Sequence, residues 1–314
     1  APDVDGLRVL AAQFGSGELR AVIESMTGAR WVHDTLEEAG WDVEVADAVR
    51  VKALAPLTAK TDRIDAQVLA DLSRRDLVPA IWLPPPGVRA DRELARFRLF
   101  LVKLRTAAKN RIHSALIAWG IPVVVSDLFG AEGRRMLEAL ELPPRWRESV
   151  GVSLETIHYL DTQITACHHR LVEAANNNPD VGLLKTIPGV GDILGFTIAS
   201  EIGDISRFPT PKNLVSYAGI APRVHQSGDI DRRGPIHKHG PRWLRWALIE
   251  ATIWAAKHPA YRERHQRTIK RFGKTRGPKV ARIDTAHRVT TAIWWMLNRR
   301  EGFAPRGSRS PSGR

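Results

Sequence analysis

Residues 19–46, LRAVIESMTGARWVHDTLEEAGWDVEVA, change from a strand pattern to a helix pattern and back, and they decide the fold class of the first part of the chain. The apolar run at 19–24 predicts a short buried strand, and 41–46 alternates as a second strand does. Between them, 29–39 predicts a helix that ends at a glycine. With a further helix expected over 61–75, this order predicts an α/β domain.

Beyond this domain the pattern becomes helical. A proline-rich stretch, WLPPPG at residues 82–87, cannot continue a helix or a central strand, so it predicts a boundary. Two long amphipathic helices follow, with apolar residues at spacings of three and four. Their expected seams are Leu94, Phe97, Leu101, Leu104 and Ala108 on the first helix, and Ile157, Leu160, Ile164, Cys167 and Leu171 on the second. Such seams suit antiparallel pairing within the chain and contact with a second subunit equally well.

The same patterns predict four segments. Residues 1–82 form the α/β domain, and residues 83–178 form a middle of coiled-coil helices that closes at Asn-Asn-Asn-Pro. Residues 179–301 form a helical C-terminal domain. The Gly, Ser, Pro and Arg residues of 302–314 are typical of a disordered basic tail. The fold class is therefore α/β plus all-α.

Positive charge is concentrated in the last third of the chain. The whole chain has 47 basic and 34 acidic side chains, for a formal net charge of +13. Residues 221–314 hold 22 basic and 6 acidic side chains, whereas residues 1–220 hold 25 and 28. Such asymmetry is typical of binding to a phosphate backbone, although charge that only keeps a protein soluble gives the same sum.

The first long helix carries its own basic residues. They predict either a solvated face or a rail for a nucleic-acid backbone. These residues are Arg92, Arg96, Arg98, Lys103, Arg105, Lys109 and Arg111.

Membrane insertion and export are not expected. No apolar stretch approaches the roughly 20 residues that span a bilayer, and the N-terminal residues lack the basic and apolar regions of a secretory signal. Cys167 is the single cysteine, so no disulfide framework is possible within the chain. These features predict a soluble cytoplasmic protein.

Three carboxylates fall at positions suited to chemistry. Asp62 and Asp65, in KTDRIDA at residues 60–66, are three residues apart and share one helix face. Glu24 ends the first expected strand, where a side chain can point toward that helix. Together the three acids predict a site for Mg²⁺, which prefers oxygen ligands. Acids in a first helical turn also serve simply as caps, and that alternative stays open.

Ser227 lies in the most basic part of the sequence. A hydroxyl surrounded by cations could attack phosphorus, because the cations would stabilise the negative charge of the transition state. Taken alone, it is one serine among many. The surrounding basic residues expected to bind nucleic acid are Arg223, Arg232, Arg233, Lys238 and Arg242.

Residues 187–191, IPGVG, lie between two apolar stretches and have the form of a helix-hairpin-helix. Gly189 and Gly191 would let the turn approach a phosphate while backbone N–H groups point toward it. A tight turn between two packed helices is the alternative.

Taken together, five segments resemble the motif series of the insertion-sequence family 110 transposases and of the related Piv/MooV DNA invertases. The resemblance runs in order from about residue 5 to residue 301, and the KTDRIDA and YAGIAP to SG blocks are its most specific parts. The segments are ESMTG at 24–28, KTDRIDA at 60–66, IPGVG at 187–191, YAGIAP at 217–222 and SG at 227–228.

This resemblance implies a partial RNase H-like, RuvC-like domain, a coiled-coil middle and a helical C-terminal transposase domain. It also implies recombination of donor and target DNA under the guidance of a structured noncoding RNA. By the family pattern, Glu24, Asp62 and Asp65 match three of the four DEDD acids. Ser227 matches the serine that becomes joined to DNA. Acids and serine from different domains would meet only after docking or oligomerisation, so a homo-oligomer, dimer or tetramer, is expected.

One departure concerns the first DEDD acid, which the family pattern places on a strand several tens of residues before the glutamate. Here Glu24 is only 23 residues from the start, and Asp3 and Asp5 are too close to it. We therefore expect a chain that is truncated at its N-terminus, lacks the first strands and exposes a sheet edge. Two other functions remain open: a metal-dependent junction-resolving nuclease, and an inactive remnant that only binds DNA or RNA.

Overall fold

The structure is a computed structural model that describes residues 3–14, 19–54, 61–227 and 230–305. The chain divides into two compact units, Ala1–Pro85 and Pro86–Arg314, and each is described by itself. Most of the described residues are helical, and strands are few.

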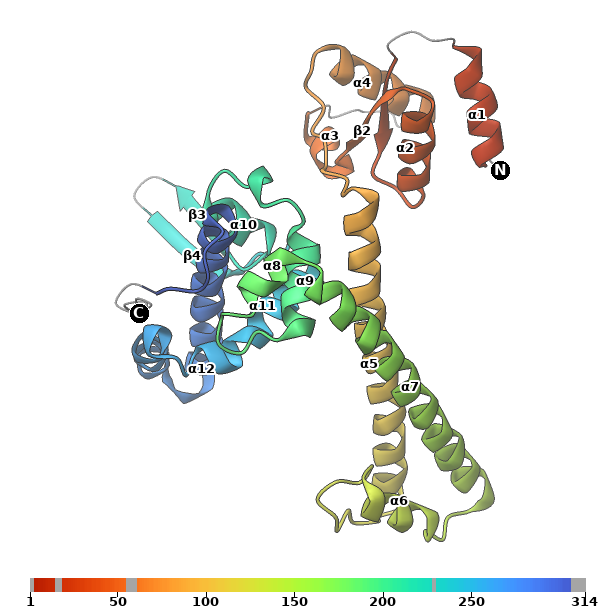
Figure 1. The fold of residues 1–314 in the computed structure, drawn as a ribbon, viewed down its shortest axis with the longest axis vertical. Helices are drawn as coiled ribbons and strands as arrows, with labels where there is room; N and C mark the ends of the chain where they lie inside the picture. Colours follow the sequence, from red (N-terminus) through yellow and green to blue (C-terminus); the bar gives the residue numbers. More distant parts are fainter. Residues whose placement is uncertain (1–2, 15–18, 55–60, 228–229, 306–314) are drawn as a thin grey trace. The chain divides into compact units, whose positions relative to one another are not determined.

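The first unit contains a small parallel sheet (Figure 1). Strand β1 (Arg20–Glu24) pairs with β2 (Asp42–Ala46), and α2 (Ala29–Glu38) connects them. Helix α4 (Asp62–Arg74) packs against β1. The predicted strand–helix–strand order and the following helix are therefore confirmed to within about two residues. Helices α1 (Val4–Gln13) and α3 (Ala48–Leu54) complete the unit.

The prediction that the first strand is buried was wrong, because the described side chains of β1 are partly exposed or exposed. The cause is its position at a sheet edge. Among the described strands β1 has β2 as its partner, whereas β2 also bridges to Ala80 on its other side. The core beneath the sheet is small, with Ala11, Leu36 and Val43 at its centre.

The second unit begins with two long helices, α5 (Pro86–Ala118) and α7 (Pro144–Asn176), with α6 (Ala131–Glu138) in the segment that joins them. Leu94, early in α5, lies against Cys167, late in α7, whereas Ile112 packs with Val150 and Ile157 nearer the other ends. The helices therefore pair antiparallel within the chain, as Figure 1 also shows. Of the two pairings that the seams allowed, this is the one formed.

The seam of α7 is as predicted, and on α5 three of the five predicted residues, Leu94, Leu101 and Ala108, pack in the apolar clusters with α7. The prediction was wrong at the other two. Phe97 and Leu104 are 44% and 40% exposed, whereas Arg105, one residue further on, forms an ion pair with Asp161 of α7 at 2.6 Å. Arg98 occupies the equivalent place one heptad earlier, where burial lowers the pKa of its guanidinium. Arginine can take a seam position because its apolar stem packs while its head stays polar.

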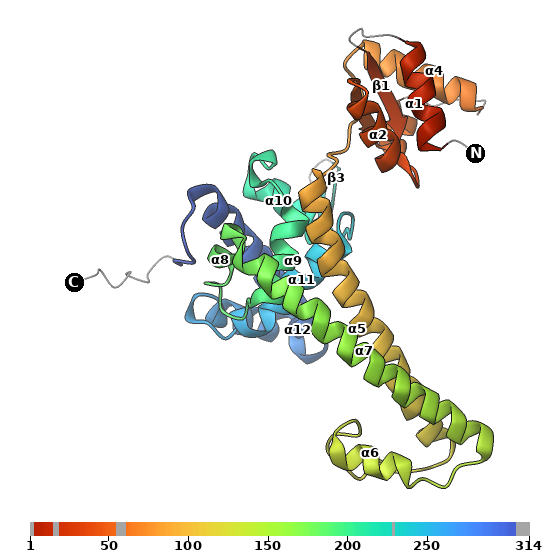
Figure 2. The same cartoon turned by 45° about the vertical axis from the view of Figure 1, so that its right-hand side comes forward.

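The C-terminal helices surround a second core. Helix α9 (Asp192–Ile202) is its centre, and all its residues from Gly195 onward are buried. Around it pack α8 (Pro179–Leu184) and α11 (Arg242–Ala255), as Figure 2 shows. The short helices η1 (Ile205–Arg207) and α10 (Pro211–Tyr217) lead into the hairpin of β3 (Pro222–Ser227) and β4 (Ile230–Ile236).

The last helix, α12 (Pro259–Arg299), is bent sharply at Gly273, whose φ is 74° and ψ is 174°. The two limbs fold toward each other. Arg264 on the first limb donates to both carboxylate oxygens of Asp284 on the second, at 2.7 and 3.0 Å, and His265 contacts Thr285 at 2.9 Å. A glycine is required at the bend because its φ lies in the left-handed region.

The chain divides between Pro85 and Pro86, and residues 86–314 form one compact unit. The predicted domain boundaries at 82/83 and 178/179 stay predictions. Within the predicted tail of residues 302–314, Phe303 donates its N–H to the Thr186 hydroxyl oxygen at 2.7 Å and packs against His258 and Tyr261, so this residue is ordered. Residues 306–314 of the tail lie outside the described residues. No described helix combines the length and apolar character needed to cross a membrane.

Candidate nucleic-acid interface and acid group

The three candidate acids lie on two neighbouring elements of the first unit. Glu24 is the last residue of β1 and is exposed. Asp62 and Asp65 lie in the first turn of α4, which contacts β1. Thr61 caps this helix by accepting a hydrogen bond from the N–H of Ile64 at 3.3 Å. Thr61 therefore supplies the hydrogen-bonded cap, while both aspartates lie where the helix dipole favours an acid.

These acids do not form a ready-made metal site. Within the described ranges, no group of three or more His, Cys, Asp or Glu side chains is close enough to hold a metal ion. Their chemistry suits a hard divalent cation, since all three offer carboxylate oxygens, but the three side chains are not gathered around one point. No step of the chemistry is therefore derived through a metal.

Ser227 is the last residue of β3, and β4 begins at Ile230. In the antiparallel register it lies opposite Ile230, and His225 lies opposite Arg232. Arg233 lies opposite Val224, so both arginines follow Ser227 on the returning strand. The side chains of residues 224–233 lie outside the described ones, and residues 228–229 are outside the described backbone.

Two glycines let the ends of this hairpin cross closely. Gly219 has φ 70°, and a Cβ there would lie 2.1 Å from the carbonyl oxygen of His239. Gly240 has φ 88°, and a Cβ there would lie 1.9 Å from the carbonyl oxygen of Tyr217. Any larger residue would push the crossing segments apart. These backbone contacts therefore set where the hairpin leaves the C-terminal core.

Three of the predicted cations have described side chains near that crossing. Arg223 and Lys238 are exposed, as is Arg242, whose guanidinium lies 4.7 Å from the ring centroid of Trp243. Burial lowers the pKa of His237, and the neighbouring His239 and Arg223 lower it further. His237 therefore favours its neutral form, and it accepts a hydrogen bond from the N–H of His239 at 3.2 Å.

The turn between α8 and α9 carries the glycine pair of the predicted hairpin motif. Gly189 has φ 89°, and a Cβ there would lie 2.4 Å from the Cβ of Trp254. Gly191 precedes α9 and provides no side-chain cap for its first turn. The turn and the end of α11 line an open cavity of about 620 Å³. The sequence indicated the glycines but not the tryptophan that lies against them.

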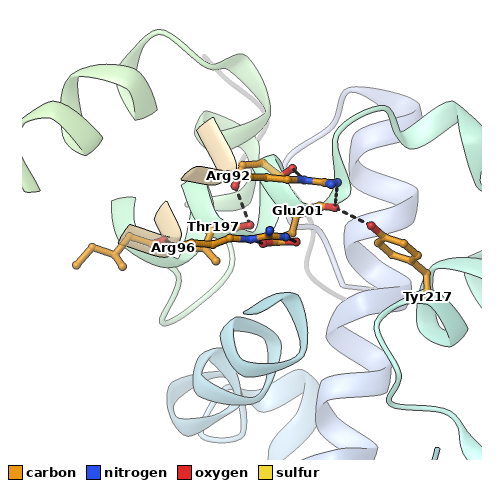
Figure 3. A network of polar contacts seen from close by, with 7 residues as sticks. Arg92, Arg96, Thr197, Glu201 and Tyr217 are labelled. Carbon is orange, nitrogen blue, oxygen red and sulfur yellow. Dashed lines mark hydrogen bonds and ion pairs between the residues drawn. The ribbon is translucent and has the colours of Figure 1, made fainter. Parts of the chain in front are cut away.

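A buried polar network attaches α5 to the C-terminal core, and Figure 3 shows it from close by. Arg96 donates to both carboxylate oxygens of Glu201 at 2.6 and 2.9 Å, and Glu201 is fully buried. Arg92 donates to the backbone carbonyls of Ser200 and Glu201, and Tyr217 donates to that of Glu201. The pKa of Arg96 is raised, mainly by this hydrogen bonding.

The network bears on both interpretations of the basic residues of α5, the solvated face and the nucleic-acid rail. Arg92 and Arg96 point into the protein, and Arg105 pairs with Asp161, so these three cations do not form one solvent-facing row. The charge pattern missed Glu201 as their partner. The available signal was Glu201, an acid in the apolar second half of the helix DILGFTIASEI, because an acid at such a place is buried only with a cation.

Two models of transposase families match this chain. A model of the IS110-type DEDD transposases, described as a transposase, matches residues 3–119. A second model, described as the transposase IS116/IS110/IS902 family, matches residues 181–266. Together the two matches cover more than half of the chain and both of its units.

Individual relatives extend along most of the chain. The transposase for insertion sequence element IS1111A of Coxiella burnetii is 27% identical over 286 residues, which are 90% of this chain and 78% of the relative. The pilin gene-inverting protein of Moraxella lacunata is 28% identical over 289 residues, 86% of this chain and 78% of the relative. The transposase for insertion sequence element IS1328 of Yersinia enterocolitica is 25% identical over 228 residues, which are 73% of this chain and 68% of the relative. The chain therefore belongs to the IS110/IS116/IS902 family of transposases.

Proposed function

We propose that this transposase exchanges DNA strands through a covalent bond between DNA and Ser227. The Ser227 oxygen attacks a phosphodiester phosphorus, the bond from phosphorus to one sugar oxygen breaks, and that oxygen leaves as a hydroxyl after taking up the serine proton. A hydroxyl of another strand then reverses the step on the serine ester. Each step replaces one phosphate ester with another, so no nucleotide hydrolysis is needed.

The backbone position of Ser227 in a basic hairpin supports this proposal. It is the last residue of β3, with Arg232 and Arg233 on the opposite strand and with Arg223 and Lys238 near the hairpin's ends. Fixed cations around a phosphorus stabilise the negative charge that develops in the transition state. The crossing glycines favour a defined origin for the hairpin, which such positioning requires.

The family's DEDD acids imply a divalent ion, and we propose Mg²⁺ with Glu24, Asp62 and Asp65 as its candidate ligands. Magnesium in proteins commonly uses only one or two carboxylates and completes its shell with water and phosphate oxygens. The pair on α4 meets that requirement better than all three acids do. When bound, the ion would supply charge for a phosphate group at this end of the first unit.

We also propose that both nucleic-acid partners bind the second unit. Its α8–turn–α9 segment would act as a helix-hairpin-helix, with Gly189 and Gly191 allowing close approach to a phosphate backbone. Guidance by a structured noncoding RNA rests on membership of the family and on the basic charge of residues 221–314.

The acids and the serine belong to different units, so a composite site needs either docking of the units or a second subunit. We propose a homo-oligomer on this ground. Its simplest test is to mix chains that carry Ser227→Ala with chains that carry Asp62→Asn. Recombination by the mixture, but by neither variant alone, would require that one subunit supplies the serine and another the acid.

The covalent intermediate is tested by incubating the chain with end-labelled DNA and Mg²⁺, then separating the products under denaturing conditions. We expect labelled DNA that migrates with the protein, and its loss in Ser227→Ala. Ser216→Ala, which removes an exposed hydroxyl from α10, should keep the adduct and serves as the matched control.

Two other outcomes would replace the proposal. Continued cutting by Ser227→Ala without an adduct would indicate a metal-dependent nuclease in which water attacks, a function that the acids on β1 and α4 would support. Salt-sensitive binding without any cleavage would indicate a noncatalytic remnant.

A further inference from the structure

The cavity beside the α8–α9 turn has a tryptophan and two basic residues in its lining. It is lined by the turn residues Lys185 to Gly191 and, from the other side, by Trp254 of α11 and by Lys257 and His258, which lie between α11 and α12. Its volume of about 620 Å³ lies within the range of small-molecule sites, and so would accommodate one nucleotide. The two walls come from segments more than sixty residues apart in sequence.

Trp254 is 60% exposed, the largest exposed fraction among the chain's ten tryptophans. By contrast, Trp294 has its indole N–H bonded to the carbonyl oxygen of Phe208 at 2.8 Å and is partly buried. Leaving an indole in water forfeits much of the stabilisation that its burial would bring. The packing of the C-terminal core therefore does not account for a tryptophan at this place.

The position of Trp254 is fixed by the turn. Gly189 approaches so closely that a Cβ there would lie 2.4 Å from the Cβ of Trp254 and 3.1 Å from its Cγ. The base of the side chain is therefore held between α11 and the turn, while the ring extends into the cavity wall. A flat apolar surface with one fixed orientation is what a planar ligand requires.

Positive charge lies beside this surface. The Lys257 ammonium is 3.9 Å from the ring centroid of Trp254, and His258 lies next to it on the same wall. Lys185 is paired with Asp192, so its charge is partly balanced. The flexible Lys257 side chain can leave the ring and follow a phosphate, because both partners attract an ammonium group.

We propose that this cavity binds one unpaired nucleotide of the nucleic-acid partner, with its base stacked on Trp254 and its phosphate near Lys257. A stacked base inside a duplex has no free face for an indole, so the site would select single-stranded ends, bulges or splayed positions. This rests on the proposed function, because it refines how the α8–turn–α9 segment contacts nucleic acid. It adds a base contact where the hairpin motif alone implies only backbone contacts.

The test compares binding of two labelled DNA hairpins that share one duplex, of which one is blunt and the other has a short single-stranded tail. Wild-type protein should bind the tailed hairpin more tightly. Trp254→Ala should weaken binding to the tailed hairpin by about 5- to 150-fold, the range for loss of one aromatic–base stack. Its affinity for the blunt hairpin should change by less than about twofold.

Two further variants make the test specific. Trp254→Phe keeps a ring face and should retain most of the preference for the tail. Trp295→Ala is the matched control, because Trp295 is 44% exposed and has Arg299 over its ring at 4.4 Å, but does not line the cavity. Thermal unfolding of each variant verifies that it is folded. Repeating the series with an RNA tail identifies which strand binds more tightly.

The failures are distinguishable. Equal binding of both hairpins by wild type, unchanged in Trp254→Ala, would overturn the nucleotide site and leave the proposed function standing. An equal loss on both hairpins, or the same loss in Trp295→Ala, would also overturn it, because the contact would then not be base stacking at this cavity. No binding of any nucleic acid by wild type would overturn the proposed function as well.

Discussion

Gly240 lies in the segment that follows β4, where the backbone comes close to the carbonyl group of Tyr217. Its φ of 88° is in the left-handed region, and a Cβ would lie 1.9 Å from the Tyr217 oxygen. We expect Gly240→Ala to lower the free energy of unfolding by about 2–4 kcal/mol, since strain in φ and a backbone clash add together. Urea unfolding of wild type and variant measures the difference.

Gly120→Ala separates the two contributions. Gly120 has φ 62°, but nothing lies within 4 Å of the Cβ that alanine would add. The control should therefore lose only about 1–2 kcal/mol, the cost of a left-handed alanine. If both variants were equally destabilised, close approach at the hairpin crossing would not be the reason for a glycine at residue 240.

At the residue scale, sequence patterns located the glycines and the acids but not the residues that contact them. The resemblance singled out the turn at Gly189 and the segment around Gly219. It did not single out Trp254, whose exposure depends on how α11 meets the turn. A single tryptophan in a basic, aromatic stretch has no periodicity that separates a core residue from a surface one.

At the scale of elements, α5 is attached to the C-terminal core by one buried ion pair. Glu201 is fully buried, and Arg96 is partly exposed. We expect Arg96→Met to destabilise the chain by about 2–4 kcal/mol, somewhat below the range for a fully buried pair, because it leaves a buried carboxylate without its cation. The measurement is the free energy of unfolding of the second unit's helices by circular dichroism.

The double variant Arg96→Met with Glu201→Met should recover much of this loss, because it removes both charges. Arg105→Met provides the comparison, since Arg105 and Asp161 are 30% and 39% exposed and should contribute about 1 kcal/mol or less. A double variant no more stable than Arg96→Met would mean that packing of the stems, and not charge pairing, holds α5 in place.

The seam of α5 explains why periodicity alone was insufficient. Phe97 and Leu104 have the spacing of a buried row, yet both are exposed. Arg105, the residue after Leu104, faces α7 instead, because it pairs there with Asp161. A heptad pattern counts apolar residues and ignores that an arginine stem packs nearly as well. On α7 no such competitor exists among the seam positions, and the predicted row is the buried one.

For the whole molecule, three histidines make stability depend on pH. Burial is the main cause that lowers the pKa of His237, His265 and His287. In the unfolded chain they take up protons near pH 6.5, before the folded ones do. The free energy of unfolding should therefore fall as pH drops through about 6.5, and the loss should level off below the folded pKa values.

Thermal unfolding midpoints measured between about pH 8 and pH 5 test this. The window is separate from that of Asp204 and Asp284, whose lowered pKa values make stability fall only when pH drops below about 4. His265→Gln removes one of the three groups and should flatten the upper step. A midpoint that does not change between pH 8 and pH 5 would contradict the expectation.

Across the molecule, the helices and strands could be predicted from the sequence, but the meeting of distant side chains in space could not. The strand–helix–strand of residues 19–46 and the two long helices follow from short-range periodicity. Whether Glu24 meets Asp62 and Asp65 depends on side-chain directions at the ends of two elements, which no spacing specifies. The described residues accordingly have the expected elements without the expected acid cluster.

The sharp bend of α12 has a final consequence for the free protein. Lys270 and Arg271 lie before Gly273, and Lys274 and Arg276 lie after it, so the bend places four exposed like charges close together in the chain at one corner. Arg271 and Arg276 even share one ring, at 5.4 and 5.5 Å from the centroid of Phe272. Mutual repulsion makes that corner costly in isolation. A polyanion bound across the corner would offset this repulsion, so binding would lower the electrostatic free energy of the bend.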